Sequence, residues 1–239
     1  MIQIERRHFG VLIPSTNTTV EIEYTRHLPA TLQFHVGRCG KAANTPFSPS
    51  LDEDVIRQSK LLGDAKVEVI TLAQTSASLF DDDYDTRVKA QMSSNAGVPA
   101  VTSAEAIGEA VRALGMKRIG IVTPYSAEVI QRAKQYLEMK YGLQVLGMEG
   151  FGATDAYAIG KLDANMAFEA LQRVDTPEIE VLIVPGGNFP TMPWIAAWER
   201  ALGKPVITTN QATLWGALGV MNLNNPMPGL GRLLQQMPR

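Results

Sequence analysis

The chain repeats one arrangement of segments in its two halves. Residues 9–17 read FGVLIPSTN and residues 119–127 read IGIVTPYSA, and each is a β-branched run that stops at a proline. VEVITLAQTS (67–76) has its counterpart in IEVLIVPGGN (179–188), and GVPAVTS (97–103) in GKPVITTN (203–210). The three pairs occur in the same order with offsets of 110, 112 and 106 residues. Similar segments in one order at nearly one spacing indicate an internal duplication.

The repeated segments alternate between two kinds of local structure. The apolar runs show no polar alternation, which is typical of strands buried on both faces of a parallel sheet. The intervening stretches 51–63, 103–115, 126–141 and 162–173 have helical spacing. This pattern predicts an α/β fold of two pseudo-symmetric, doubly wound parallel-sheet lobes with a ligand cleft between them. We assign residues 1–101 and 208–239 to the first lobe and 102–207 to the second.

Composition excludes several classes of function. A net charge of −2 leaves no basic footprint for nucleic acid or an anionic membrane. The single cysteine, Cys39, excludes an internal disulfide, and the three histidines show no metal-ligand spacing. No apolar run approaches the length of a membrane span or a signal segment, so we expect a cytoplasmic protein.

Small polar residues follow four of the predicted strands. The segments are 14–19 (PSTNTT), 74–76 (QTS), 124–126 (PYS) and 185–188 (PGGN). Ligands in parallel α/β sheets bind beyond the carboxyl ends of the strands, and hydroxyl, amide and backbone N–H groups suit carboxylate oxygens. The alternative is that these residues only cap the following helices. The dinucleotide fingerprint and the phosphate loop are missing from the sequence, which disfavours a nucleotide enzyme.

Four stretches carry a resemblance to a known family. They are LIPSTNTTVE (12–21), QTSASLF (74–80), GVPAVTSAEAIGEAVRALGMKRIGIVTPY (97–125) and IVPGGNFPTM (183–192). The chain resembles the aspartate/glutamate racemase superfamily, and within it the maleate cis–trans isomerase and arylmalonate decarboxylase branch. The resemblance implies an enzyme with no cofactor and no metal, a small carboxylate substrate between two lobes, and frequent dimerisation.

The resemblance also implies which residues form the site. The two cysteines that serve as acid, base or nucleophile in the family fall on Gln74 and Gly186, so the thiols are replaced. Groups that hold a carboxylate or an enediolate in the family match Pro14, Asn17, Thr75, Ser76, Tyr125, Gly187 and Asn188. Tyr125, Gln74 and Gly186 are therefore the catalytic candidates, with Cys39 at neither cysteine position.

Three functions remain open at this point. The first is an isomerase or lyase with another proton carrier, for which Tyr125, His35 and the acidic run Asp81, Asp82, Asp83 and Asp85 are candidates. His35 can equally be structural, and the acidic run a solvated helix start. The second is a hydrolase or hydratase in which Gln74 positions a water. The third is a non-catalytic carboxylate binder or a subunit that depends on a partner protein.

Side chains around the expected cleft add two further hypotheses. Phe80, Phe189 and Trp194 are candidates for an apolar wall, or else belong to the core. Lys41, within the Pro-, Ser- and Asn-rich stretch 40–50, or Arg38, just before it, can offer a charge-assisted contact to a second carboxylate. The alternative is that this stretch is only a surface loop.

Overall fold

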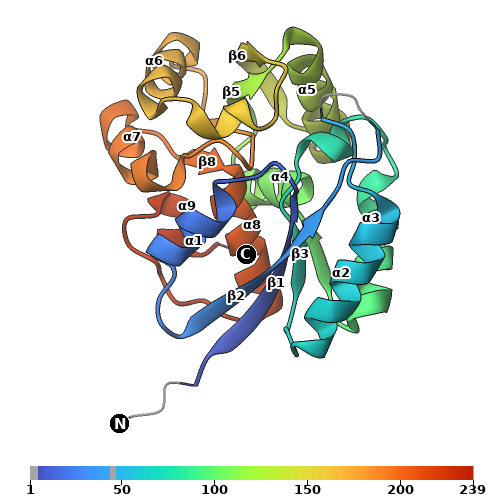
Figure 1. Ribbon diagram of the computed structural model, residues 1–239. Coiled ribbons are helices and arrows are strands. Elements are labelled where there is room, and N and C mark those ends of the chain that lie inside the picture. The colour runs from blue at the N-terminus through green and yellow to red at the C-terminus, as the bar shows by residue number, and fades with distance from the viewer. Residues whose placement is uncertain (1–4, 44–46, 239) are drawn as a thin grey trace.

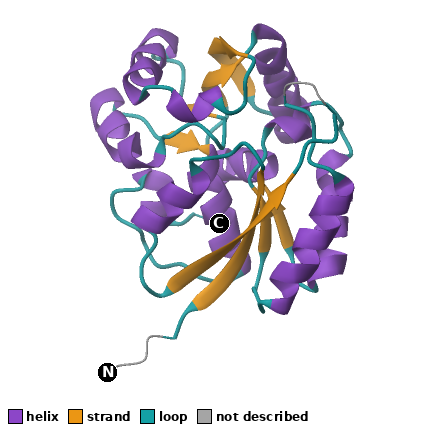
Figure 2. Ribbon diagram, viewed as in Figure 1, coloured by secondary structure: helices purple, strands orange, loops and turns teal. Residues whose placement is uncertain are grey.

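The computed structural model describes residues 5–43 and 47–238 and contains two parallel sheets. The first sheet has the order β2-β1-β3-β4, and the second repeats it as β6-β5-β7-β8 (Figures 1 and 2). The strands are β1 (Arg7–Pro14), β2 (Leu32–Cys39), β3 (Ile70–Leu72), β4 (Ala100–Thr102), β5 (Arg118–Tyr125), β6 (Gln144–Ala153), β7 (Val181–Val184) and β8 (Val206–Thr208). The shared strand order confirms the predicted α/β fold with two similar lobes.

Helices cover both faces of each sheet. They are α1 (Val20–His27), α2 (Asp52–Asp64), α3 (Tyr84–Ala96), α4 (Ser103–Ala113), α5 (Ala127–Tyr141), α6 (Ala164–Val174), α7 (Ile195–Leu202), α8 (Thr209–Val220) and α9 (Gly231–Gln236), with short 3₁₀ turns η1 (Ser76–Leu79), η2 (Ala158–Lys161) and η3 (Met192–Trp194). In the first lobe α2 and α3 lie together against one face, and α8 packs against β3 and β4 (Figure 1). Strands covered on both sides need the continuous apolar runs seen in the sequence.

The repeated glycine–proline segments end equivalent helices in the two lobes. Helix α3 ends at Gly97 with φ of 73°, and α7 ends at Gly203 with φ of 72°. A left-handed residue terminates a helix at low cost only when it lacks a Cβ. The proline two positions later cannot continue the helix, and the chain enters β4 or β8. One local rule therefore produces the same helix–strand corner twice.

The two lobes are joined through shared packing. Helices α4 and α8 each follow the last strand of a sheet and pack against each other, and each also contacts both β4 and β8. One buried apolar cluster includes Val11 and Ile13 of the first sheet with Ile121 and Val184 of the second. A separate cluster fills the space between the first sheet and the α2–α3 pair. Because α4 and α8 belong to both lobes by contact, the lobe boundaries drawn from the sequence stay a prediction.

The helices expected at 51–63, 103–115, 126–141 and 162–173 are present as α2, α4, α5 and α6. Helix α2 begins with Asp52, Glu53 and Asp54, and these carboxylates are stabilised by the positive end of the helix dipole. Within the part of the chain that the structure describes, no helix has the length and apolar character needed to cross a membrane.

Candidate active site

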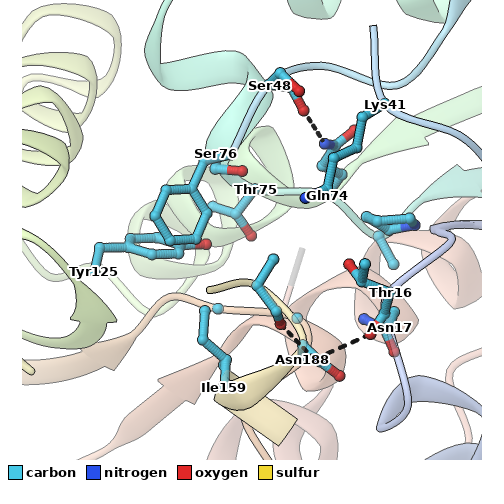
Figure 3. Close-up of a pocket in the computed structure, with 16 residues that line it drawn as sticks. Thr16, Asn17, Lys41, Ser48, Gln74, Thr75, Ser76, Tyr125, Ile159 and Asn188 are labelled. Atoms are coloured by element: carbon cyan, nitrogen blue, oxygen red, sulfur yellow. Dashed lines mark hydrogen bonds between the residues drawn. The ribbon is translucent and has the colours of Figure 1, made fainter. Parts of the chain in front are cut away.

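A cavity of about 50 Å³ lies where the carboxyl ends of the two sheets meet. Loops after β1, β2 and β3 line it from the first lobe, and Tyr125 with the loops after β6 and β7 from the second. The lining residues are Pro14, Thr16, Asn17, Lys41, Phe47, Ser48, Ala73, Gln74, Thr75, Ser76, Tyr125, Ala156, Ile159, Gly186, Gly187 and Asn188 (Figure 3). The structure thus brings together in one cavity all the residues that the family resemblance assigned to the site, while their roles stay predictions.

A larger cavity of about 470 Å³ lies elsewhere, beside Arg7, His27 and the segment 225–228. It adjoins the amino-terminal starts of β1 and β2. Ligands of parallel α/β sheets bind at the opposite, carboxyl edge. The smaller cavity is therefore the better candidate for chemistry.

Gln74 binds the loop that follows β2. Its Oε1 accepts hydrogen bonds from Ser50 N–H (3.1 Å) and Ser50 Oγ (2.8 Å), and its Nε2 donates to the carbonyl of Ser48 (2.9 Å) (Figure 3). The amide oxygen has two lone pairs, and both are engaged. One Nε2 hydrogen remains for a ligand, so the main structural task of this side chain is to hold the loop.

A chain of hydrogen bonds crosses from the second lobe to the first through Thr209. Gly186 N–H donates to Thr209 Oγ1 (2.8 Å), which lies 3.1 Å from Thr75 Oγ1. Because Thr209 Oγ1 accepts from the backbone, its own hydrogen is best satisfied by donation to Thr75. The Thr75 hydrogen is then free to donate onward. The N–H of Gly186, the one hydrogen-bond donor of a glycine, is therefore already bound to Thr209 and is not available to a ligand.

Tyr125 completes a group of three hydroxyls. Its ring packs edge-on against Phe47 with centroids 5.0 Å apart. Its side chain reaches the hydroxyls of Thr75 and Ser76 (Figure 3). Burial raises the pKa of Tyr125 far above its ordinary value, and the nearby hydroxyls of Thr75 and Ser76 offset only part of that rise. Tyr125 is therefore suited to donate a hydrogen bond to an anion and poorly suited to release a proton near neutral pH.

The two asparagines of the cavity are held by different means. Asn17 Oδ1 accepts from the N–H groups of Thr19 and Val20, both at 3.0 Å, and so caps α1, while its amide nitrogen donates to no described residue. Asn188 accepts from Thr18 N–H (2.8 Å) and donates to the carbonyl of Ala156 (2.8 Å). Asn17 thus keeps donors for a ligand, whereas Asn188 mainly ties the lobes together.

Lys41 is the one charged side chain that lines the cavity among the described residues. It extends from the loop after β2 across Gln74 toward the middle of the cavity (Figure 3), and no described carboxylate forms an ion pair with it. Arg38, the other cation considered from the sequence, pairs with Glu21 and donates to the carbonyls of Ser15 (3.2 Å) and Asn17 (3.0 Å). A cavity with one free cation and no lining carboxylate favours an anionic ligand.

The other proton carriers suggested by the sequence lie outside the cavity lining. His35 lies in mid-strand of β2, where it pairs with His8 at 2.9 Å. Asp81 to Asp83 precede α3, and Arg87 pairs with Asp81 (2.8 Å).

Asp85 corrects the expectation that the whole acidic run is a solvated helix start. Its carboxylate is fully buried and accepts from Ser78, Thr102, Tyr136 and Lys140 at 2.6–2.9 Å. Burial opposes the charge, but these four donors together hold the pKa of Asp85 below its ordinary value. Because Tyr136 and Lys140 belong to α5, Asp85 joins the two lobes instead of entering the cavity.

Cys39 is the last residue of β2 and is fully buried. Burial, helped by nearby Asp54, raises the pKa of its thiol to about 12. A thiol with so high a pKa is scarcely ionised at neutral pH and is unreactive.

The aromatic wall proposed from the sequence is not formed by the expected residues. Phe189 is buried in the core against Phe151, Phe80 lies under Arg132 on the surface, and Trp194 is about half exposed. Phe47 and Ile159 supply the apolar surface of the cavity instead. Phe47 lies in the loop after β2, where the sequence gives no periodic signal to place it.

Two further polar residues beneath the cavity went unrecognised in the sequence. Glu23 accepts from the N–H groups of Thr191 (2.7 Å) and Met192 (2.8 Å) and from Asn210 Nδ2 (2.6 Å), and Asn210 also donates to the carbonyl of Gly187 (3.1 Å). Burial raises the pKa of Glu23 to about 7 although these donors favour its charge. The sequence did contain a signal for Glu23, because helical spacing places it on the same face as Val20 and Tyr24. A carboxyl group on such an apolar, buried face indicates a buried polar contact.

Comparison with known proteins gives three consistent results. A sequence model of the family described as arylmalonate decarboxylase matches residues 9–234. The chain is 27% identical to a maleate isomerase of Nocardia farcinica, covering 96% of both chains, and 25% identical to an arylmalonate decarboxylase of Bordetella bronchiseptica, covering 99% of this chain and 100% of the relative. A solved structure of the Nocardia farcinica maleate cis-trans isomerase, a cysteine-to-serine mutant with a covalently bound succinylcysteine intermediate, superposes with a TM-score of 0.85 at 27% identity over 96% of this chain and 98% of that one.

Proposed function

Because this chain belongs to the arylmalonate decarboxylase family, we propose that it is a cofactor-independent isomerase or lyase of a small carboxylic acid. It stabilises an enediolate and does so without the thiols that the family resemblance places at Gln74 and Gly186. Relatives that are named maleate isomerase and arylmalonate decarboxylase support the two reaction classes.

The observation that carries the proposal is the meeting of the hydroxyls of Thr75, Ser76 and Tyr125 at one point of the cavity. Loss of a proton or of CO₂ beside a carboxylate leaves an electron pair that spreads onto two oxygens. Donors that are already oriented toward such oxygens stabilise the charge as it develops, and each contributes roughly a factor of 10²–10³ in rate. Thr209 supports this orientation because it directs the Thr75 hydrogen away from itself.

Each lobe has one part in this reaction. Thr75 and Ser76 of the first lobe lie near Tyr125 of the second, so the enediolate oxygens would bind at the interface between the lobes. Asn17 offers its free amide hydrogens to a further carboxylate oxygen at the first-lobe edge. Phe47 and Ile159 provide an apolar surface for a substituent next to the reacting carbon.

The hydrolase or hydratase alternative has weaker support. It needs the Gln74 amide to hold and polarise a water, but the carbonyl oxygen of that amide already accepts two hydrogen bonds from Ser50. We therefore do not place a water-activating role on Gln74. The non-catalytic binder is kept as an outcome of the following experiment.

The test is ¹H NMR of the purified protein in D₂O with maleate, arylmalonates, and amino- and hydroxy-dicarboxylates. We expect new product signals or loss of an α-proton signal for at least one acid, and none with a Thr75→Val, Tyr125→Phe double variant of unchanged melting temperature. Line broadening of an acid without any chemical change would contradict the proposal and identify a binder. Solvent ¹⁸O in the product would favour the hydrolase instead.

A further inference from the structure

Among the described residues that line the cavity, only Tyr125 and Lys41 belong to the side-chain types that enzymes use as general acids. His35, Cys39 and Asp85 all lie outside its lining. An enediolate becomes product only when its carbon receives a proton. The enediolate site described above therefore needs a carrier, which the missing thiols do not supply.

We propose that Lys41 is this proton carrier and that Gln74 positions it; the inference rests on the proposed function. Lys41 points from the loop after β2 toward the hydroxyls, so its ammonium can approach the carbon while Thr75, Ser76 and Tyr125 hold the oxygens (Figure 3). An ammonium has three donor hydrogens and no acceptor, and its charge attracts the enediolate before the transfer.

The proton transfer balances without any other reactant. The electron pair of the enediolate carbon takes a proton from Lys41 Nζ, so one N–H bond breaks and one C–H bond forms. The product is a carboxylate, and the amine that remains is neutral. Water then returns a proton to the amine, which is possible because Lys41 lies at the exposed mouth of the cavity.

The backbone around Lys41 explains how Gln74 acts on it. Lys41 forms an antiparallel bridge with Ser50, and the neighbouring bonds Ala42 N–H to Pro49 O (2.8 Å) and Leu51 N–H to Gly40 O (2.9 Å) close the same pairing. Gln74 holds Ser50 through both its N–H and its hydroxyl. The amide that stands at a family thiol position therefore fastens the segment that brings in the amine.

Binding alone is the competing role for Lys41, and its free charge would serve that role as well. An arginine at position 41 separates the two roles. A guanidinium binds carboxylates at least as well as an ammonium, but it does not give up its proton in a protein. A small external amine also separates binding from proton transfer. In a variant with a shortened side chain at position 41, it can occupy the vacated space and donate a proton there.

The experiment measures kcat and KM of the wild type, Lys41→Gln and Lys41→Arg with an acid that the wild type converts, with and without methylammonium. We expect kcat to fall about 10²–10⁴-fold in both variants, with KM changed less than about fivefold, and methylammonium to restore part of kcat in Lys41→Gln only. Lys60→Gln, an exposed lysine on α2, is the matched control and should match the wild type.

A double-mutant cycle tests the positioning by Gln74. Gln74→Ala should lower kcat in the wild-type background and have no further effect when Lys41 is already glutamine, since the two residues then act through one step. Equal losses in both backgrounds would assign Gln74 a separate role and overturn the positioning.

Three results would overturn the role of Lys41, and they are distinguishable. A kcat within threefold of wild type in Lys41→Gln, or a raised KM that Lys41→Arg restores, would leave the proposed function intact and remove only the proton carrier. A wild type that converts no acid would reject the proposed function itself, and the carrier with it.

Discussion

The loops after β3 and β7 occupy equivalent places in the two lobes but present different chemistry to the cavity. The first-lobe loop offers the side chains of Gln74, Thr75 and Ser76, whereas the second-lobe loop offers Gly186, Gly187 and an asparagine whose amide is already bound. Duplication thus preserved the strand ends and the backbone corners. It did not preserve the side chains, so of these two loops the first offers more polar side-chain groups to a ligand.

The two loops also differ in how they are held. Neutral groups bind the part of the first loop that lines the cavity, with Thr75 against Thr209 and Gln74 against Ser48 and Ser50. The second rests on Asn210, which binds the carbonyl of Gly187 and is itself bound by the carboxylate of Glu23. The partners of Gln74 and Thr75 are thus neutral, whereas the backbone of Gly187 depends on a carboxyl group through Asn210, and this difference can be measured.

The largest expected effect is a pH dependence of stability that comes from Glu23. Its pKa is raised from 4.5 to about 7, so the folded protein retains this proton while the unfolded chain has lost it. The contribution of Glu23 to the free energy of unfolding is therefore fully present below pH 4.5, and about 3 kcal/mol of it is lost as the pH rises through 7. Urea unfolding at pH 4.5 and 7.5 should show this loss in the wild type.

Glu23→Gln is the matched variant for this prediction. The change removes the titration but keeps a side chain of the same size, so the fall in unfolding free energy between the two pH values should be smaller by about 3 kcal/mol. The same pH dependence in both proteins would mean that Glu23 is ionised throughout, and that the two loops do not differ in this respect.

Tyr125→Phe removes the hydroxyl that, in the proposed function, the second lobe contributes to the enediolate oxygens. We expect kcat to fall about 100-fold, or about 2.7 kcal/mol in the barrier. The phenyl ring retains its packing against Phe47, so the melting temperature should change little. Steady-state kinetics with a converted acid checks this, and an unchanged kcat would mean that the first lobe suffices.

Gly186→Ala tests whether the second loop can carry any side chain. Gly186 has φ of 136°, and a Cβ there would lie 3.0 Å from Pro124 Cγ. Backbone strain of this kind costs about 2 kcal/mol, which corresponds to a fall of about 4–8 °C in melting temperature for a chain of this size. Gly187→Ala separates backbone strain from crowding, because Gly187 has no positive φ but its Cβ would lie 3.1 Å from the carbonyl oxygen of Ala73. A melting temperature equal to wild type would show that a thiol can be restored at position 186 without strain.

The features of the fold that depend on local rules could be predicted from the sequence. The glycine–proline corners at Gly97 and Gly203 and the apolar runs of β1 and β5 identified two similar parallel sheets. The sheet rule then placed Thr75, Tyr125 and Gly186 in one cavity. These inferences need only the spacing of segments and the direction of strands, which follow from the order of residues in the sequence.

The rest depends on contacts between distant segments. Asp85 looks like its exposed neighbours in the sequence, yet its carboxylate meets Tyr136 and Lys140 about fifty residues away. Thr209 matches Ser103 in the duplicated segments, but only the packing of α8 against the first lobe brings it to Thr75. Lys41 was expected near the cleft, but no local pattern indicates the hydrogen bonds by which Gln74 holds Ser50, its partner across the antiparallel bridge.

Substitution of Cys39 has the smallest expected effect on activity. It tests directly whether the first lobe supplies a catalytic thiol. The thiol is buried at the end of β2 with a pKa raised to about 12, and it does not line the cavity. Because a thiolate and not a thiol reacts, iodoacetamide at pH 7.5 should label the folded protein far more slowly than the urea-unfolded chain. Cys39→Ala should change kcat less than twofold, in contrast to the large losses expected at Lys41 and Tyr125. Loss of turnover on labelling the folded wild type, but not Cys39→Ala, would restore a catalytic thiol to the first lobe, and the amine at Lys41 would no longer be needed to explain proton transfer.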